Sequence, residues 1–534
     1  MPLSRSLLII ALLWAAIYLP GLGGQELKGE EGRRILPGVT MLKSGDWIVP
    51  RVAGAVYNRK PPLVNWAIAA SIKLGERTEF WARLPSTLSA LALALGIAVF
   101  CRGFLGEGGA FAAAIMALAN ISLVEKGRLA EIEPLYIALA GLAFCAWAAL
   151  WLRGANRWLT WIAAGLLLGA GFLAKGPLHV VIFYVFAALV LHKAKALREI
   201  VSPPSIAGLL ALAAVAAPWF WLNLSQNPDE GAKGEWLYQI THRLGMNEFS
   251  LSDWLLSVPL GILNFLPWSP LLILLWRRRV VESLGLTGRE RAFFYGARLA
   301  LAICFFAIAL LPSSRPRFTL PLLAPACVLV AFVLARSWPF IGETIKAWWA
   351  RVFAALCALI AAGAPVAAFV TKQTGPPGLA AAGVCLVGGI FAARWILGRD
   401  DRSLPRLALA GALPFCLAAA VLGGIAYPAA RAHEDIRPTG KAMRAAAGDG
   451  VPAVVYKAAG SYQPWLFYLG EPYAEAASWG DLPDLAEAGA PALITPERRW
   501  DKEGEKLTKR YGPPKSVQPV DDPRERERYV IVRF

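Results

Sequence analysis

The strongest constraint on the fold is a series of apolar segments, each long enough to cross a lipid bilayer. A spanning helix needs about 20 predominantly apolar residues, and about thirteen such segments follow one another along the chain. We place them at 7–22, 85–103, 109–124, 134–152, 158–173, 178–192, 205–224, 255–276, 293–312, 320–336, 348–370, 378–397 and 405–427. Because the bilayer offers the backbone no hydrogen-bond partners, the sequence predicts an all-α polytopic membrane bundle.

Composition supports this class, because 57% of the 534 residues are hydrophobic and the mean hydropathy is +0.50. The first segment, 7–22, is read as a transmembrane helix rather than a signal peptide, because no convincing small-residue cleavage site follows it. The seven cysteines lie in or beside apolar segments without a CxxC pair, so neither disulfides nor a zinc finger is predicted.

The basic residues predict the orientation. The net charge is +17, but the basic residues are scattered over loops. We therefore expect them to set the orientation of the chain in the membrane and to contact anionic lipid head groups, rather than to bind nucleic acid. With the N-terminus in the cytoplasm, the inside loops hold Arg102, Arg153, Arg157, Lys193, Lys195, Arg198, Arg277, Arg278, Arg279, Arg289, Arg291, Arg336, Lys346, Arg399 and Arg402. The short outside loops hold only Lys126, Arg128, Lys175, Arg315, Arg317 and Lys372. An odd number of helices then places the C-terminus outside.

Two domains are expected. Residues 1–427 form the membrane domain, whose outer loop 23–83 carries amphipathic helices at 33–44 and 63–74. Residues 428–534 form a small extracytoplasmic α/β domain, because hydrophobicity falls there and helix and strand patterns alternate. We expect its strands at 451–456, 490–494 and 529–534, and its helices at 438–447, 463–469 and 497–511.

Two acidic sites in the outside loops are candidates for chemistry. Glu30 and Glu31 precede a basic cluster, and a carboxylate beside cations at a membrane surface suits a base that accepts the proton of an attacking hydroxyl. Glu131 and Glu133 follow Arg128 where the fourth apolar helix begins. The structural alternative for both pairs is stabilisation of a helix N-terminus by negative charge.

A set of basic residues in the outside loops suits a lipid phosphate at head-group depth: Arg59, Lys60, Lys175, Arg315 and Arg317. Charges placed against the topology rule near a membrane are functional candidates by default. The alternatives are ordinary loop solvation and anchoring to native phospholipids. No metal site is assigned, although His242 with Glu235, Glu248 and Asp253 leaves a divalent metal open as a cofactor.

Ordered motifs over roughly residues 1–340 resemble a known family. They are GEEGRRILPGVTMLKSGDWIVP, YNRKPPLVNW, ARLPSTLSA, GRLAEIEPLY, GLLLGAGFLAKGP, APWF, NFLPWSP and RPRFTLPLLAPA. The chain resembles the bacterial dolichyl-phosphate-mannose-protein mannosyltransferase-like family of the GT-C group. Aminoarabinose transferases of lipid A and protein O-mannosyltransferases belong to the same group.

The resemblance implies roles for individual residues. The family's catalytic Asp falls on Glu30, with Glu31 and Arg33 on the Glu and Arg that follow it, so either glutamate qualifies as the base. The family's second acid falls on Glu133. Its Lys-Pro-Pro and Lys-Gly-Pro motifs fall on Lys60 and Lys175, and Arg317 falls in the basic turn before the Leu-Pro helix. The resulting site has catalytic Glu30, Glu31 and Glu133, phosphate-binding Arg33, Arg59, Lys60, Lys175, Arg315 and Arg317, and acceptor- or sugar-binding Arg128 and Glu131.

The resemblance further implies an inverting glycosyltransferase of the cytoplasmic membrane. It would move a sugar from a polyprenyl-phosphate donor to a lipid, glycan or protein acceptor at the outer face, among membrane lipids and without nucleic acid. The rival classes are a polyprenyl-lipid flippase or transporter and a non-catalytic membrane scaffold. A transporter would be expected to show internal repeats, and none is seen.

Overall fold

The computed structural model describes the chain except Met1, Ala53, 227–249, Ser313, 399–400, 449–450, 457–463, Glu471, Ala477, 483–491 and 523–526. The described residues form two compact units. The first unit comprises Met1–Leu22, Arg59–Val64 and Arg83–Ala426. The second comprises Gly23–Asn58, Asn65–Ala82 and Tyr427–Phe534.

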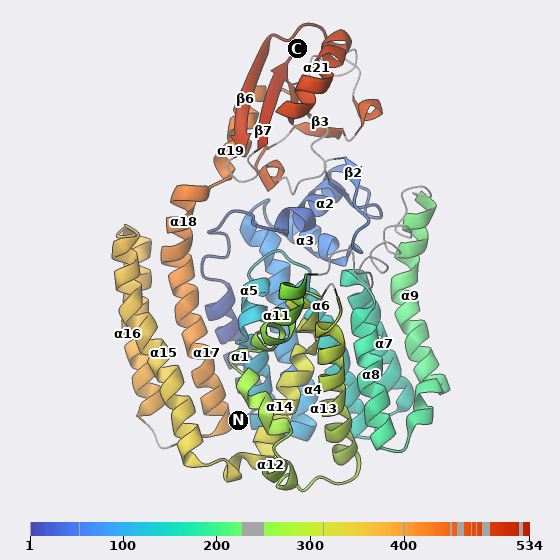
Figure 1. Ribbon diagram of the computed structural model, residues 1–534, viewed down its shortest axis with the longest axis vertical. Helices are drawn as coiled ribbons and strands as arrows, with labels where there is room; N and C mark the ends of the chain where they lie inside the picture. The colour runs from blue at the N-terminus through green and yellow to red at the C-terminus, as the bar shows by residue number, and fades with distance from the viewer. Residues whose placement is uncertain are drawn as a thin grey trace. The chain divides into compact units, whose positions relative to one another are not determined.

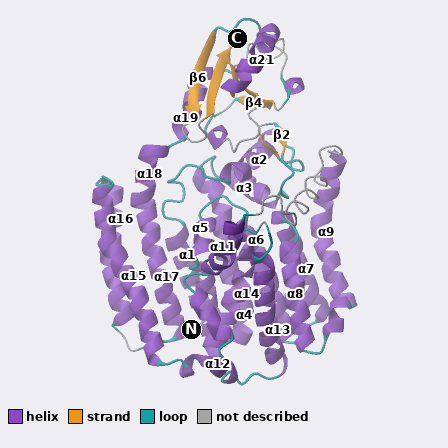
Figure 2. Ribbon diagram, viewed as in Figure 1, coloured by secondary structure: helices purple, strands orange, loops and turns teal. Residues whose placement is uncertain are grey.

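The first unit is a bundle of apolar helices (Figures 1 and 2). Its longer helices are α1 (Leu3–Tyr18), α4 (Glu79–Leu118), α6 (Glu133–Leu152), α7 (Arg157–Lys175), α8 (Leu178–Lys193), α9 (Pro203–Gln226), α11 (Leu251–Leu263), α13 (Gly288–Ala309), α14 (Leu323–Ser337), α15 (Glu343–Val370), α16 (Pro376–Leu397) and α17 (Leu404–Val421). Short segments join them: α5 (Ile121–Gly127), α12 (Arg278–Glu282), η1 (Leu197–Val201), η2 (Ser269–Leu275), η3 (Pro316–Leu322), η4 (Trp338–Phe340) and the π-helical η5 (Leu422–Ala426).

Each predicted apolar segment overlaps a helix of this bundle. In the described part of the chain, nine helical spans are long and apolar enough to cross a membrane. The predicted number is larger because α4 contains two predicted segments, and because α1, α8 and α11 are apolar but shorter. The fold is therefore the predicted polytopic helix bundle, and the chain is a multi-pass membrane protein.

Two predicted segments end differently in the structure. The segment 109–124 stops at Leu118, because the Asn120 side chain accepts a hydrogen bond from the Leu123 amide at 3.0 Å and caps the separate helix α5. The segment 255–276 is interrupted after Leu263, and its second half is the 3₁₀-helical η2. An asparagine lies at each break. The side-chain amide of Asn120 donates to the Asn264 carbonyl, and that of Asn264 donates to the Pro316 carbonyl.

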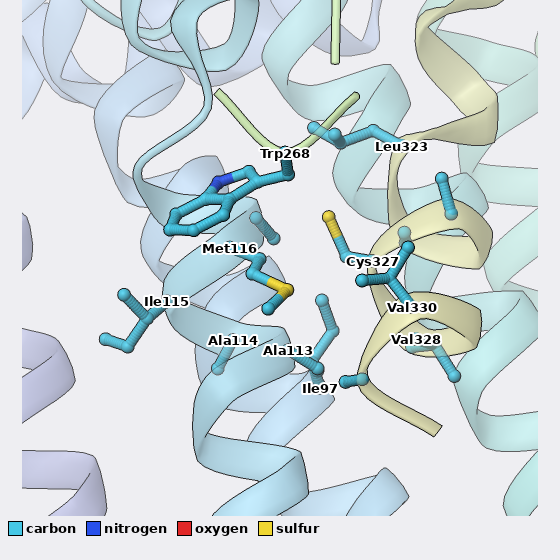
Figure 3. Close-up of a cluster of buried hydrophobic side chains, with 14 of the residues drawn as sticks. Ile97, Ala113, Ala114, Ile115, Met116, Trp268, Leu323, Cys327, Val328 and Val330 are labelled. Carbon is cyan, nitrogen blue, oxygen red and sulfur yellow. The ribbon is translucent and has the colours of Figure 1, made fainter. Parts of the chain in front are cut away.

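Part of the core of the first unit consists of side chains from α4 and α14 packed around Trp268, the residue before η2. Figure 3 shows Trp268 above Met116 of α4 and facing Cys327 of α14. The Trp268 indole N–H donates to the carbonyl of Ala119 at 3.1 Å, so this large apolar side chain is buried with its polar atom satisfied. Elsewhere, α7 and α9 approach so closely that a Cβ on Gly165 would lie 2.0 Å from the carbonyl oxygen of Gly208.

The outer helices expose large apolar side chains. Leu359 of α15 and Phe391 of α16 are 69% and 70% exposed. Exposed apolar surface of this extent is unfavourable in water and is expected where a bilayer covers the helix. The composition of these helices therefore matches their place at the periphery of the bundle (Figure 1).

The second unit combines the outer loop with the C-terminal residues. The loop forms α2 (Glu31–Ser44), the short strands β1 (Arg51–Val52) and β2 (Ala55–Val56), and α3 (Leu63–Leu74). The predicted amphipathic helices at 33–44 and 63–74 correspond to α2 and α3. Several loop side chains bond the C-terminal residues: Lys43 donates to the Tyr473 carbonyl at 2.8 Å, and the Tyr468 hydroxyl donates to Glu79 at 3.0 Å.

The C-terminal residues form the small α/β domain that the sequence predicts. Its sheet has the order β4-β3-β5-β7-β6, in which β3, β4 and β5 are parallel and the β5–β7 and β6–β7 pairs are antiparallel. The strands are β3 (Ala453–Tyr456), β4 (Tyr473–Ala476), β5 (Ala492–Pro496), β6 (Ser516–Asp522) and β7 (Glu527–Arg533). Its helical elements are α18 (Tyr427–Glu434), α19 (Arg437–Ala447), η6 (Pro464–Phe467), η7 (Trp479–Asp481) and α21 (Glu497–Tyr511).

Candidate functional site

A buried carboxylate stands at the first residue of α6. Glu133 is 5% exposed and Glu131, two residues earlier, is 7% exposed. Pro134 directly follows Glu133 and suits the first turn of a helix, because proline has no N–H that a helix start would leave unpaired. Two carboxylates are thus removed from water at the point where an apolar helix begins, which is costly unless cations accompany them.

Lys175 supplies the closest cation. It is the last residue of α7, and its ammonium nitrogen lies 2.9 Å from Oε1 of Glu133. The next residue, Gly176, has φ 117°, a backbone conformation that favours glycine, and Pro177 then leads into α8. The Lys-Gly-Pro sequence therefore ends one helix, reverses the chain and leaves the lysine against the acid of α6.

A second cation reaches the same carboxylate oxygen from a distant part of the chain. Arg317 lies in η3, and its Nε is 3.9 Å from Oε1 of Glu133. The start of η3 is fixed by Asn264, whose amide group donates to the Pro316 carbonyl at 2.7 Å and to the Thr319 hydroxyl at 3.2 Å. Three separate segments of the first unit, at α6, α7 and η3, therefore converge on one carboxylate.

Aromatic rings surround the lysine. The Lys175 ammonium lies 5.3 Å from the ring centre of Tyr136 and 5.7 Å from that of Phe318. These distances allow cation–π attraction, and the rings also exclude water from the ion pair. The ammonium is consequently held in a surrounding of lower polarity than bulk water.

His179 holds the turn that follows Lys175. Its backbone N–H donates to the Tyr136 hydroxyl at 2.8 Å. Its ring nitrogens lie 3.0 Å from the Gly176 carbonyl oxygen and 2.9 Å from the Leu168 carbonyl oxygen. This buried histidine therefore connects the turn to α6 and to the interior of α7.

Glu131 has a different electrostatic setting from Glu133. Burial raises the pKa of Glu131 to about 7, and the neighbouring Glu133 carboxylate adds to this rise. Lys126 lies 3.5 Å from Glu131 and opposes the shift, but it also pairs with Glu125 at 3.0 Å. The two acids therefore differ: Glu133 is paired with Lys175 and Arg317, whereas the raised pKa of Glu131 favours its protonated form.

Arg128, expected to bind acceptor or sugar, instead contacts backbone. Its side chain is buried and donates to the carbonyl oxygens of Ile17, at 2.6 Å, and Pro20. These bonds fasten the end of α1 to the segment before α6. Arg128 therefore has a structural role that the sequence did not indicate, because backbone partners cannot be read from a sequence. Its contact with an acceptor or sugar stays a prediction.

Three further predicted phosphate ligands lie in the first unit. Arg59 and Arg315 are exposed, whereas Lys60 is half-buried. Arg315 immediately precedes η3 and so stands two residues before Arg317. Lys60 is followed by Pro61 and Pro62, which lead into α3.

The other predicted residues belong to the second unit, at the start of α2. Glu30 precedes the helix, and its Oε2 accepts a hydrogen bond from Arg34 Nη2 at 2.8 Å. Arg33 lies 3.9 Å from the other oxygen of Glu30. Arg34 also donates to the Tyr57 hydroxyl at 2.8 Å, and its backbone carbonyl accepts from Asn65 at 2.8 Å. The second arginine of the motif therefore links Glu30 to Tyr57, the residue after β2, and to α3.

Glu30 and Glu31 differ in their access to solvent. The Glu31 side chain is fully buried and accepts a hydrogen bond from the Lys28 amide at 2.8 Å. The Glu30 side chain keeps 24% of its surface exposed. Of the two acids, Glu30 is therefore the one that a dissolved hydroxyl group can approach.

The predicted site is thus spread over both units. The structure brings together Glu131, Glu133, Lys175 and Arg317 in one unit, and Glu30, Arg33 and Arg34 in the other. Convergence of these two sets stays a prediction. Sequence reasoning missed Tyr136, Phe318 and His179 as neighbours of Lys175; Tyr136 lies three residues after Glu133 on α6, and this helical spacing was the available signal.

The metal hypothesis has no support among the described residues. No group of three or more His, Cys, Asp or Glu side chains there could hold a metal ion. His242, Glu235 and Glu248 lie outside the described residues.

Comparisons with known proteins agree with the family resemblance that the sequence motifs predict. The family model for dolichyl-phosphate-mannose-protein mannosyltransferase matches residues 59–221. The chain is 26% identical over 334 residues to undecaprenyl phosphate-alpha-4-amino-4-deoxy-L-arabinose arabinosyl transferase 2 of Proteus mirabilis, covering 61% of this chain and 58% of the relative. It is 27% identical over 335 residues to the corresponding transferase of Pseudomonas aeruginosa strain LESB58, covering 62% and 59%. These matches span about three fifths of each relative.

A solved structure shares the fold over almost the whole chain. The crystal structure of ArnT from Cupriavidus metallidurans bound to undecaprenyl phosphate superposes with a TM-score of 0.71 at 17% identity, covering 99% of this chain and 97% of that one. The apo form of the same protein gives 0.67 at 18% identity. The resemblance predicted from the sequence is therefore confirmed: this chain has the fold of ArnT and is similar in sequence to undecaprenyl phosphate-alpha-4-amino-4-deoxy-L-arabinose arabinosyl transferases.

Proposed function

We propose that this protein is a membrane glycosyltransferase that moves a sugar from a polyprenyl-phosphate donor to a lipid, glycan or protein acceptor, with inversion. The observation that carries the proposal is the buried cluster in which Lys175 and Arg317 meet at Glu133. Such a cluster at the ends of apolar helices is costly to desolvate and is expected to be used. The names of the sequence relatives, which are undecaprenyl-phosphate-aminoarabinose transferases, indicate the donor class.

In this proposal the cations hold the phosphate of the donor. Lys175 and Arg317 meet at Glu133, and Arg59 and Lys60, within the outer loop 23–83, belong to the same unit. Negative charge grows on the phosphate oxygen as the sugar departs, so cations fixed in a water-poor setting stabilise the transition state more than the ground state. Glu133 keeps Lys175 aimed into the site and contacts the hydroxyls of the sugar or acceptor.

Glu30 is the proposed base, and Glu31 its structural neighbour. The acceptor hydroxyl gives its proton to the Glu30 carboxylate while its oxygen forms a bond to the anomeric carbon. The bond from that carbon to the phosphate oxygen breaks, and its electron pair leaves with the polyprenyl phosphate. Attack opposite the leaving group inverts the anomeric centre. Partial exposure of Glu30 supports this choice over the buried Glu31.

An apolar cavity in the first unit suits the polyprenyl chain. Its volume is about 320 Å³, and residues of α11, η2, α13 and α14 line it, including Phe265, Trp276, Leu301, Phe305 and Ala326. A hydrocarbon chain gains free energy in such a cavity, whereas a sugar would lose its hydrogen bonds to water there. We assign the cavity to part of the donor lipid.

The proposal is tested with washed membranes, radiolabelled polyprenyl-phosphate sugars and a panel of acceptors. Wild-type protein should transfer label, and Glu30→Gln should lose at least about 100-fold in rate, because general base catalysis contributes on the order of 10²–10⁴. Glu76→Gln, at an exposed acid outside the site, is the matched control. Full transfer by a normally expressed Glu30→Gln protein would remove Glu30 from the base role. Movement of the lipid across the bilayer without any sugar transfer would favour a flippase. Unchanged function after substitution of Glu30, Lys60 and Lys175 would favour a scaffold.

A further inference from the structure

A second pocket, with charged residues in its lining, lies within the C-terminal α/β domain. Its volume is about 500 Å³, and Trp479, Glu503, Lys506 and Lys509 line it. Trp479 begins η7, and the three charged residues lie along one side of α21, which appears at the top of Figure 1. The proposed transfer reaction uses none of these residues.

The charged groups of this pocket differ in how they are held. The Glu503 carboxylate accepts a hydrogen bond from the buried Tyr456 hydroxyl at 2.6 Å, which fixes its position. Lys506 and Lys509 are exposed and three residues apart on α21. Among the described residues, neither ammonium group has an ion-pair or hydrogen-bond partner. The pocket therefore presents one fixed acceptor and two available cations.

Trp479 supplies an aromatic surface beside these charges. It is 36% exposed, so part of the indole surface is accessible at the pocket. The Arg510 guanidinium lies 5.5 Å from its ring centre and donates to the Leu482 carbonyl at 2.7 Å. Arg510 thereby fixes both ends of the short η7 segment and holds the indole at the pocket.

The topology of the sheet favours ligand binding at this place. The parallel strands run in the order β4-β3-β5. Trp479 follows the carboxyl end of β4, and α21 follows that of β5. Tyr456, whose hydroxyl holds Glu503, is the last residue of β3. Open α/β sheets bind ligands between segments that leave the carboxyl ends of neighbouring parallel strands.

We propose that this pocket binds an anionic saccharide. A pyranose ring would lie on Trp479, its carboxylate or phosphate would be held by Lys506 and Lys509, and a hydroxyl would donate to Glu503. An aromatic face suits the C–H side of a sugar ring, and two cations on one helix face suit a single negative group. This binding is independent of the transfer reaction and requires no donor.

Saturation-transfer NMR on the full-length protein in phosphatidylcholine nanodiscs tests the proposal. The probes are glucuronic acid and glucose 6-phosphate, compared with glucose, and inorganic phosphate is assayed as a competitor of glucose 6-phosphate because it has no observable proton of its own. We expect both anionic sugars to bind at least 10-fold more tightly than glucose. Lys506→Gln with Lys509→Gln should abolish that preference, and Trp479→Ala should weaken binding of every sugar. Lys502→Gln, at an exposed lysine of α21 outside the pocket, should change nothing.

Several outcomes would overturn the proposal. They are absence of binding to the wild-type protein, unchanged affinity in the double lysine variant, or inorganic phosphate binding as tightly as glucose 6-phosphate. Because both lysines are exposed, their replacement does not endanger folding, and Trp479→Phe should retain most of the affinity if the ring is the contact. The same anionic sugar could be presented by a membrane lipid instead of in solution, and a glucuronosyl lipid placed in the nanodisc tests this source. Its binding supports the site if the double lysine variant weakens it and contradicts the site if that variant does not.

Discussion

Glu133 shows how much a single buried charge demands of its neighbours. Its carboxylate is nearly inaccessible, yet it has an ammonium at 2.9 Å and a guanidinium at 3.9 Å. Breaking a buried ion pair by removing one partner costs about 3–5 kcal/mol, whereas removing both charges costs much less. Stability and catalysis can therefore be separated at this pair.

Lys175→Met should destabilise the protein by about 3 kcal/mol, because the Glu133 carboxylate loses its nearest cation. The double variant Glu133→Gln with Lys175→Met should recover most of that loss. Both variants should be at least about 100-fold slower in transfer, because the proposed phosphate ligand is absent in each. Thermal unfolding in detergent and the transfer assay measure the two effects. Equal stability of Lys175→Met and the wild type would contradict the pairing.

Glu131 should make stability depend on pH with a sign opposite to that of an ordinary salt-bridged acid. Its pKa is raised from 4.5 to about 7 by burial and by Glu133, so between these values the folded state binds more protons than the unfolded state. Titration of Glu131 therefore leaves the free energy of unfolding unchanged below pH 4.5. It lowers this free energy as the pH rises to 7, by on the order of 3 kcal/mol. Unfolding temperatures of the wild type should fall more steeply from pH 5 to pH 8 than those of Glu131→Gln. Parallel curves would show that Glu131 titrates normally.

The sequence identified the charged residues of the site but not most of their partners. Glu133 and Lys175 stood out because they are charges beside apolar segments, and the structure pairs them. Arg128 stood out for the same reason, yet its partners are carbonyls of Ile17 and Pro20. A charge near a membrane signals that a partner is needed, but the sequence does not state whether that partner is backbone, side chain or substrate.

At the scale of elements, α4 shows how one glycine interrupts a helix. The predicted segments 85–103 and 109–124 meet there, and Gly106 between them has φ 70° and ψ 166°. This combination lies in a region that only glycine adopts without strain. The predicted break therefore coincides with the residue that makes it.

Gly106→Ala should lower the free energy of unfolding by about 1–3 kcal/mol, because a Cβ is strained at this backbone conformation even though no atom would lie within 4 Å of it. Gly363→Ala is the matched control. A Cβ on Gly363 would also have open space around it, but this residue lies inside α15 with ordinary helical geometry. There alanine should be neutral or slightly stabilising. Urea or thermal unfolding of the two variants side by side measures the difference, and equal effects would contradict the argument.

Elements with strong periodicity were predictable, whereas the two edge strands of the sheet were not. Helix α21 occupies the predicted range 497–511 because its apolar residues recur at helical spacing. Strands β4 and β6 were not predicted. β6 contains Pro519 and four polar residues, which its place at the edge of the sheet tolerates because one side of an edge strand has no ladder partner.

At the scale of the whole molecule, long-range partners decide which segments fold together. The outer loop, which the sequence pattern assigned to the membrane domain, forms one compact unit with the C-terminal residues. Bonds such as that from the Gly54 amide to Glu475, at 2.8 Å, join residues more than 400 positions apart. Local patterns predict the helices of this loop, but they carry no information on so distant a partner.

The orientation of the chain is the prediction that concerns the molecule as a whole. The bias of basic residues places α12 in the cytoplasm and the C-terminal domain outside. The seven native cysteines are buried or half-buried, so single added cysteines can be labelled over a low background. In sealed spheroplasts, a membrane-impermeant maleimide should label Gln518→Cys, at an exposed position of β6, without permeabilisation. Arg278→Cys, whose native side chain is 89% exposed, should react only after the membrane is opened. Each variant is the control for the other. Labelling of Arg278→Cys alone in sealed spheroplasts would show the opposite topology. Glu133 and Lys175 would then lie on the cytoplasmic side, away from the proposed outer-face reaction.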